Sequence, residues 1–507
     1  MQREVIAFLS TSAAYGRTAE PVERIDTHIS IVWLTADRAF KLKRAVHYDY
    51  VDFSTLELRR AACEAEIRLN RRTAPSLYLG VRAVTRESDG SLALGGTGEP
   101  IEWLVEMQRF DQDTLFDRLA ESGRLDEALM ERLASEIVRL HNGARVRTDH
   151  GCRAGMAWVA DGNDRGLLEH GADVLDQAAC ARLSADTRAA LSTHGRYLDA
   201  RRRDGFVREC HGDLHLRNIC LLDGTPTIFD GVEFNDEISC IDVLYDVAFL
   251  LMDLWRRGLR AHANVVLNEY MAAASPLDAL SLMPLFLSCR AAVRAKTSVT
   301  AAAVQADNTR RLEMETAARQ YLDLSEGFLH PAPPRLIAIG GYSGSGKSTL
   351  ARGLAPDVGA APGALIVRSD VIRKALLGVT TSTRVGAEGY SPVMTQRVYQ
   401  AVVKRAGTAL RAGQSVIADA VFAQPGHREA IEGTARDAGV PFIGLWLDGP
   451  RDVLAQRIAH RSMDVSDATA DVLEAQLRAG AGAINWHRLD GGGSVATVLA
   501  GAQRALA

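Results

Sequence analysis

The segment Gly341-Tyr342-Ser343-Gly344-Ser345-Gly346-Lys347-Ser348 fits the pattern GxxxxGK[ST] of a phosphate-binding loop. The strand-like run Leu336–Gly340 precedes it, and the helix-like run Thr349–Leu354 follows it. In this context, backbone N–H groups and the positive end of the helix surround phosphates. Lys347 is expected on the β- and γ-phosphates of ATP and Ser348 on Mg²⁺. The predicted nucleotide-binding residues are Gly341, Ser343, Gly344, Ser345, Gly346, Lys347, Ser348 and Thr349.

Downstream of this loop, short apolar runs alternate with helical stretches. The runs are Leu365–Val367, Ser415–Ala418 and Phe442–Leu447. Alternation of this kind indicates a parallel sheet with right-handed crossovers. The last third of the chain is therefore predicted to be an α/β P-loop NTPase domain.

Polar residues at the ends of these strands are candidates for chemistry. Asp370 follows the second strand, where it could accept the proton of a substrate hydroxyl, and Arg373 lies one helical turn on and could hold an anionic substrate. Asp370 could instead be a helix N-cap. Asp419 closes a later strand and is expected at the metal, unless it is only a turn residue.

Two arginines are candidates for a closing lid over the nucleotide. Arg457 and Arg461 are four residues apart in a helical stretch, so both would project from one face toward bound phosphates. Because arginines are abundant in this chain, a solvated helix face is an equally good interpretation.

The chain changes character at His330–Leu336, where three prolines fall within five residues. We therefore predict two domains, 1–329 and 330–507. Before the boundary, Ser30–Leu34 and Arg38–Leu42 indicate a β-hairpin, and Ser54–Arg72 indicates an amphipathic helix.

From about residue 113 the first domain becomes mostly helical, as in Leu125–Leu140. A second hairpin, Ile219–Leu222 with Thr227–Phe229, interrupts the helices around the turn Asp223-Gly224. A small β-rich lobe followed by a larger helical lobe is the order of a two-lobed, kinase-like α+β domain.

The segment His211–Asn218, HGDLHLRN, has the spacing HxDxxxxN of a kinase catalytic loop, and Asp230 follows across the hairpin. Phosphoryl transfer needs a carboxylate at the attacking hydroxyl and oxygen ligands for Mg²⁺. Asp213 is the predicted base, and Asn218 and Asp230 are the predicted metal ligands.

A lysine that anchors the nucleotide is expected on a strand of the β-rich lobe, paired with a helix glutamate. Lys41 and Lys43 share one strand face and are the only lysines before Lys296. An exposed strand edge is the alternative. Lys43 is preferred as the anchor, and Glu64 is preferred over Glu66 as its partner.

Residues 335–507 resemble small P-loop kinases of the gluconate-kinase, polynucleotide-kinase and zeta-toxin groups, through GYSGSGKST, RSDVIRKAL, SVIADAVF and RIAHRSMDVSDAT. That resemblance implies a base at Asp370 and phosphate contacts from Arg457 and Arg461. The form HGDLH makes residues 25–320 similar to the aminoglycoside phosphotransferase and choline-kinase-like family, in which acids such as Asp242 and Asp246 support the site. The whole chain resembles bacterial fusions of these two folds.

Composition sets limits on partners and location. The net charge of −4 offers no general attraction to nucleic acid or membranes, so neither is expected as a partner. The seven cysteines form no CxxC pair, and the sequence carries no secretory leader or long apolar run. We expect a cytoplasmic protein.

These observations predict a bifunctional kinase that transfers the γ-phosphoryl group of Mg-ATP to a hydroxyl of a small molecule. One alternative keeps a single active module beside a regulatory nucleotide-binding domain. Another is a nucleotide-driven switch that acts on a partner protein. The acceptor, the oligomeric state and the domain orientation are not predicted, because no motif names the residues that decide them.

Overall fold

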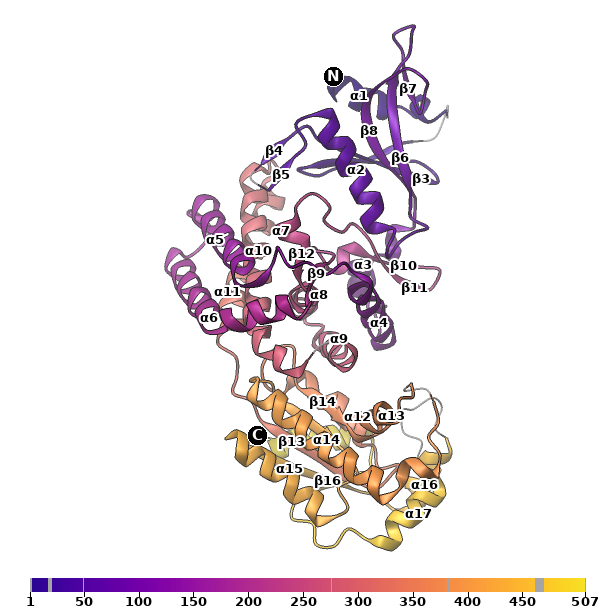
Figure 1. Ribbon diagram of the computed structural model, residues 1–507, viewed down its shortest axis with the longest axis vertical. Helices are drawn as coiled ribbons and strands as arrows, with labels where there is room; N and C mark the ends of the chain where they lie inside the picture. The colour runs from indigo at the N-terminus through magenta and orange to yellow at the C-terminus, as the bar shows by residue number, and fades with distance from the viewer. Residues whose placement is uncertain are drawn as a thin grey trace. The chain divides into compact units, whose positions relative to one another are not determined.

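A computed structural model describes residues 2–16, 21–48, 50–274, 276–380, 383–460 and 469–506. The chain forms two compact units, one of residues 1–165 with 188–253 and one of residues 166–187 with 254–507. Figure 1 shows the elements of both, coloured along the chain. The helices between residues 254 and 329 are grouped with the second unit. The motif-based boundary at 329/330 is a different division and stays a prediction.

An antiparallel sheet of six strands begins the first unit. The helix α2 (Leu56–Asn70) packs on it through Cys63 and Ile67, which meet Val105 of β8. The predicted hairpin at 30–42 is confirmed as β2 and β3, and Thr55 caps the N-terminus of α2 by accepting from Leu58 N–H. In sheet order the strands are β1 (Glu23–Asp26), β2 (Ser30–Leu34), β3 (Arg38–Lys43), β8 (Glu99–Gln108), β6 (Tyr78–Arg86) and β7 (Leu92–Leu94).

Outside this sheet, the chain up to residue 256 is mostly helical, as predicted from about residue 113 onward, and parts of α5, α6 and α8 belong to the second unit. Asp126 caps α4 by accepting from Leu129 N–H, which starts this helix within the predicted run. The predicted second hairpin is confirmed as β10 and β11. The elements are α1 (Gln2–Leu9), β4 (His47–Tyr48), β5 (Val51–Asp52), α3 (Phe116–Glu121), α4 (Glu127–Gly143), α5 (Cys152–Gly171), α6 (Gln177–Arg203), β9 (Val207–Glu209), β10 (Ile219–Leu222), β11 (Thr225–Ile228), α7 (Asp236–Ser239), β12 (Cys240–Asp242) and α8 (Val243–Arg256).

A five-stranded parallel sheet lies in the second unit, in the order β14-β15-β13-β16-β17. Its central strand β13 is buried along its whole length, so both faces must be covered, as parallel sheets require. The predicted kinase-like α+β and P-loop α/β folds are both confirmed. The strands are β13 (Leu336–Gly341), β14 (Leu365–Arg368), β15 (Val416–Asp419), β16 (Phe442–Asp448) and β17 (His487–Asp490).

Helices accompany this sheet, and three more form the part of the second unit that precedes it in sequence, from residue 260 to residue 329. They are α9 (Arg260–Ala273), α10 (Met283–Val304), α11 (Asn308–Leu329), α12 (Lys347–Leu354), α13 (Ser369–Leu376), α14 (Pro392–Arg411), α15 (Pro425–Ala438), α16 (Arg451–Ala459), α17 (Ala470–Ala479) and α18 (Val495–Leu506). Side chains of α12 and α18 meet those of β13 in one apolar core, which includes Ile337, Leu350 and Ala502.

Helix α9 covers the edge strand β14 in place of a further strand. Asn268 Nδ2 donates to Ala364 O at 3.2 Å, and Ile366 N–H donates to Asn268 Oδ1 at 2.7 Å. Asn264, which is 3% exposed, donates to Ala364 O at 3.0 Å. These amides satisfy backbone groups that a sheet edge leaves unpaired. The strand that leads to Asp370 is thereby fixed from both sides.

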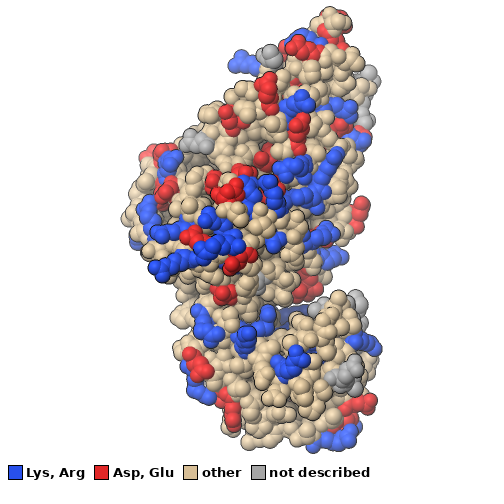
Figure 2. Space-filling view, in the orientation of Figure 1, with Lys and Arg blue, Asp and Glu red and all other residues tan. Residues whose placement is uncertain are grey.

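The surface carries both signs of charge. Figure 2 shows acidic and basic side chains interspersed on the face in view. Within the described residues, no helix is both long and apolar enough to span a bilayer.

Candidate active sites

The catalytic-loop segment His211–Asn218 follows β9 and is fixed by its backbone. His211 N–H and Gly212 N–H donate to the two carboxylate oxygens of Asp246, at 3.1 and 2.9 Å. Gly212 has φ +84°, and a Cβ there would lie 3.0 Å from Ile238 O, so glycine suits this position. The loop is therefore held by α8, which Asp246 occupies near its start.

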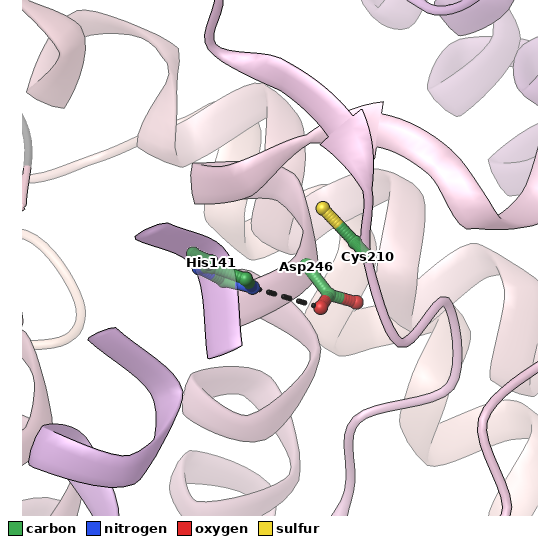
Figure 3. Close-up of side chains that lie close together, drawn as sticks. All are labelled: His141, Cys210 and Asp246. Carbon is green, nitrogen blue, oxygen red and sulfur yellow. Dashed lines mark hydrogen bonds and ion pairs between the residues drawn. The ribbon is translucent and has the colours of Figure 1, made fainter. Parts of the chain in front are cut away.

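Figure 3 shows His141, Cys210 and Asp246 close together behind this loop. Their potential ligand atoms lie within 4.8 Å of one another, and all three residues are buried. However, both oxygens of Asp246 already accept backbone N–H groups, and His141 Nε2 lies 3.1 Å from one of them. Burial raises the pKa of the Cys210 thiol well above its usual value, which opposes the thiolate that a metal needs. The cluster supports the loop rather than a metal.

Within the loop, Asp213 and Asn218 are hydrogen-bonded to each other. Asn218 Nδ2 donates to Asp213 O at 2.9 Å and to Asp213 Oδ2 at 3.1 Å. His215 Nε2 lies 3.3 Å from the same Oδ2. The side chain of Asp213 is 38% exposed, so a substrate hydroxyl can approach it. The geometry suits a general base.

Asp230 joins this pair from the far side of the β10–β11 hairpin. It adopts φ +62°, and its N–H donates to the hydroxyl of Tyr78 at 3.0 Å. Burial by itself raises the pKa of Asp230, but the charge of Lys41, 2.5 Å away, outweighs it and holds the pKa below its usual value. The nearby negative charge of Asp213 acts in the opposite direction and raises the pKa of Asp230. The predicted base and one predicted metal ligand thus belong to one site.

Both predicted lysines reach this site, but through a different glutamate from the predicted one. Lys41 Nζ lies 2.9 Å from Glu66, and Lys43 Nζ pairs with Glu66 and Glu233. Glu64 is on the opposite, exposed face of α2, where it pairs with Arg60. The preference for Glu64 is corrected to Glu66.

The geometry favours Lys41 over Lys43 as the lysine on the open side of the site, although this geometry does not test the preference for Lys43. Lys43 is 1% exposed and sits behind Glu66, whereas Lys41 is 13% exposed and contacts Asp230 directly. Lys41 is therefore the more accessible of the two lysines, and which of them contacts the nucleotide stays a prediction. Despite the opposing effect of burial, the charge of Glu233 raises the pKa of Lys43, so its ammonium stays protonated.

The charges of this site fit a divalent cation. Three carboxylates, those of Glu66, Asp230 and Glu233, face the two ammonium groups, which leaves negative charge in excess. Carboxylate and amide oxygens are the ligands that Mg²⁺ prefers. Asn218 and Asp230 would hold the metal, which would screen the phosphate charge during transfer.

The P-loop site lies at the carboxyl end of β13. Gly344 and Gly346 have φ +85° and +91°, and a Cβ on Gly344 would lie 2.6 Å from Leu454 O. Ser345 Oγ is buried and has no hydrogen-bond partner among the described residues. A buried hydroxyl without a partner inside a loop of this shape fits a phosphate oxygen.

A metal also fits this second site. Ser348 Oγ donates to Asp419 Oδ2 at 2.7 Å, and Asp419 is 5% exposed. A hydroxyl and a carboxylate in contact at the end of the loop are the oxygen donors that Mg²⁺ takes in P-loop proteins. Ser348 and Asp419 would therefore hold the ion, which would supply positive charge against the phosphates.

Asp370 and Arg373 begin the helix after β14. The N-cap of α13 is Arg368, so Asp370 stands inside the first helical turn and is not the N-cap. Arg373 is 7% exposed, donates from Nη1 to Gly389 O at 2.5 Å and lies over the ring of Tyr390 at 4.6 Å. Its Nε is buried without a hydrogen-bond partner in the described chain, which leaves a donor for an acceptor molecule.

The predicted lid arginines are placed differently. Arg457 Nη1 donates to Gly491 O at 2.6 Å and does not point freely toward the loop. Arg461 lies outside the described residues. Arg457 lines a cavity of about 190 Å³ together with Thr349 and Gly493.

Sequence reasoning missed this cavity, which borders the P-loop on the side of α18. Its wall includes the apolar side chains Val495, Val498 and Leu499 as well as Gly346. The signal that could have found it is the run Gly491-Gly492-Gly493-Ser494, which lets the backbone approach the loop closely. The flat, apolar nucleobase of a nucleotide whose phosphates lie in the P-loop would fit such a cavity.

The chain contains two kinds of domain: a kinase-like phosphotransferase domain and a P-loop kinase-like domain. A model of the phosphotransferase enzyme family matches residues 33–277, and a model of an AAA domain matches residues 336–481. An uncharacterised protein of Mycobacterium tuberculosis is 31% identical over 491 residues, which is 95% of each chain. The chain belongs to the same family as that protein.

Solved structures resemble each part of the chain. A choline/ethanolamine kinase family protein from Mesorhizobium loti is 12% identical and covers 64% of this chain and 99% of its own, with a TM-score of 0.35. A gluconokinase from Sinorhizobium meliloti is 22% identical and covers 34% of this chain and 93% of its own, with a TM-score of 0.25.

Proposed function

We propose that this chain is an ATP-dependent phosphotransferase with two active sites, each of which transfers the γ-phosphoryl group of Mg-ATP to a hydroxyl of a small molecule. The observation that carries the proposal is the meeting of Asp213, Asn218, Asp230 and the Lys41–Glu66 pair in one site. In that arrangement a base, metal ligands and a phosphate-binding cation stand together.

The chemical step at the first site follows from these positions. Asp213 orients the acceptor hydroxyl and takes its proton as the oxygen attacks the γ-phosphorus. The bond between that phosphorus and the β–γ bridging oxygen breaks, so ADP leaves with the electron pair. Lys41, held by Glu66, stabilises the charge on the phosphates, and transfer depends chiefly on position and electrostatics.

At the second site, Asp370 would take the acceptor proton and Lys347 would contact the phosphates. Arg373 supports an anionic acceptor, because its buried guanidinium keeps one unused donor at the carboxyl end of the sheet. The base of the nucleotide would occupy the cavity beside Arg457.

An acidic pocket for a polycationic acceptor finds no support at the first site. Asp242 is bonded to Arg201 at 2.6 Å, and Asp236 is bonded to Arg147 at 2.9 Å. Both carboxylates are therefore already neutralised by arginines of the same unit. Resistance to aminoglycosides is not part of this proposal.

The test is ADP release by the full chain with Mg-ATP and a metabolite extract, with phosphorylated products identified by mass spectrometry. The variants Asp213→Ala and Lys347→Ala are expected to lose different products. If one variant loses every product and the other loses none, only one module is active. If the extract stimulates no ADP release by the native chain, the enzyme proposal fails in favour of a nucleotide-driven switch.

A further inference from the structure

Arg368, the last residue of β14, lies at the two proposed metal ligands of the P-loop site. Its Nη2 donates to Ser348 Oγ at 3.1 Å, and its Nε lies 3.5 Å from Asp419 Oδ2. Ser348 and Asp419 are themselves in contact. A fixed positive charge therefore stands beside the oxygens that would bind a divalent cation.

The backbone fixes this position. Strands β14 and β15 are parallel neighbours, and Arg368 and Asp419 are directly paired in their register. The side chains of Arg368 and Asp419 are only 11% and 6% exposed. The contact therefore follows from the sheet itself and is shielded from solvent, where charges act more strongly on one another.

The guanidinium of Arg368 and a metal ion would compete for the oxygens of Ser348 and Asp419. The guanidinium group of an arginine is a permanent cation in proteins. Mg²⁺ would need the same hydroxyl and carboxylate oxygens, and two cations a few ångströms apart repel each other. Once the metal is bound, the contacts of Arg368 with Ser348 and Asp419 must weaken.

The proposed triphosphate site lies within reach of Arg368. Ser348 directly follows Lys347 in the phosphate-binding loop, so a side chain that already reaches Ser348 Oγ can reach oxygens of the β- and γ-phosphates. Arg373 lies farther along α13, where its guanidinium contacts Gly389 O and the ring of Tyr390.

We propose that Arg368 is a further catalytic residue of the P-loop site, an internal arginine that neutralises the metal ligands before nucleotide binds and stabilises the γ-phosphoryl group afterwards. This inference rests on the proposed function of that site. It adds charge stabilisation without any covalent step, in the way that arginine fingers act in other phosphoryl-transfer proteins.

The test measures binding and needs no acceptor. The full chain carries Asp230→Asn to weaken metal binding at the first site, and Mn²⁺ affinity is measured by electron paramagnetic resonance with a non-hydrolysable ATP analogue present. Arg368→Met is expected to bind Mn²⁺ about tenfold more tightly, because the competing cation is gone. Arg368→Lys, which keeps the charge, is expected to stay near the native affinity, as is the control Arg411→Met at an exposed arginine of α14.

Nucleotide binding without metal gives a second, independent readout. Arg368→Met is expected to bind the metal-free triphosphate analogue about tenfold more weakly, while its affinity for ADP stays unchanged, because the lost contact is to the γ-phosphate. If Arg368→Met does not fold, Arg368→Gln replaces it in both measurements.

The outcomes separate the two proposals. Unchanged or weaker Mn²⁺ affinity in Arg368→Met would show that Arg368 does not compete for the metal site. An equal loss of triphosphate and ADP would overturn its contact with the γ-phosphoryl group. If the chain with native Arg368 and Lys347→Ala binds as much nucleotide as the chain with both native residues, the P-loop site itself fails.

Discussion

A cation faces a metal-binding carboxylate in both sites, but the two cations are held differently. In the kinase-like site, Lys41 contacts Asp230 and is also held by Glu66, which is not a proposed metal ligand. In the P-loop site, Arg368 contacts Ser348 and Asp419, which are both proposed metal ligands.

The difference concerns what happens when a divalent cation arrives. Lys41 can stay in place because Glu66 continues to balance its charge. The site also has three carboxylates against two ammonium groups. Arg368 would have to give up its contacts with Ser348 and Asp419. We therefore expect the proposed metal to disturb the P-loop site more than the kinase-like site, and each prediction below examines one side of this contrast.

The largest effect is expected from removing the base of the kinase-like site. Asp213→Asn should lower the rate of formation of the first site's product by about 10²–10⁴-fold, because the amide cannot take the acceptor proton. Products of the P-loop site should form at the native rate. Asp223→Asn, at the hairpin turn of the same unit, is the control, and a similar loss in that variant would discredit the assignment of Asp213.

The next largest effect is expected on stability, from a change to Glu66, the buried partner of both lysines. Glu66 is 0% exposed between two ammonium groups, so Glu66→Gln should destabilise the chain by about 3–5 kcal/mol in denaturant unfolding. Glu64→Gln removes only an exposed pair with Arg60 and should cost at most about 0.5 kcal/mol. Equal losses in the two variants would contradict the buried pair.

The choice between Glu64 and Glu66 shows which part of the site the sequence motifs did not predict. The motifs predicted both folds, the P-loop and the members of the catalytic loop, because spacing along the chain fixes their local geometry. Glu64 was preferred although Glu66 shares the buried stripe of α2 with Cys63 and Ile67, at helical spacings of three and four residues. Weighing that stripe would have identified Glu66.

Other features depended on packing that no motif encodes. Arg457 was expected over the phosphates, but it donates to the Gly491 carbonyl, on a loop distant in sequence. The contact of Arg368 with Asp419 depends on strand order, which places β14 beside β15. Pairings of this kind follow from tertiary structure rather than from local sequence.

Strand β14, which ends at Arg368, is stabilised by its contact with α9. Asn268→Ala should leave Ile366 N–H without its partner on the α9 side and destabilise the second unit by about 1–2 kcal/mol. Hydrogen exchange of the Ile366 amide should accelerate. The exposed helical residue Asn142 supplies the control, Asn142→Ala, and unchanged exchange in Asn268→Ala would refute the role of α9.

A smaller effect is expected in the pH dependence of stability. Lys41 lowers the pKa of Asp230, so the stabilisation is present above the unfolded pKa of about 3.9 and is lost as the pH falls through the lower folded value. The stability difference between native chain and Lys41→Met should therefore be largest above about pH 4 and shrink in more acid solution. The exposed Lys404→Met should show no such trend, and a difference constant with pH would contradict the pairing.

The claim of two nucleotide sites is tested most directly by calorimetric titration of the full chain with a non-hydrolysable ATP analogue and Mg²⁺. We predict two bound nucleotides per native chain, one in Lys347→Ala and one in the pair Lys41→Met with Asp230→Asn. A single bound nucleotide in the native chain, abolished by only one of these changes, would contradict the account.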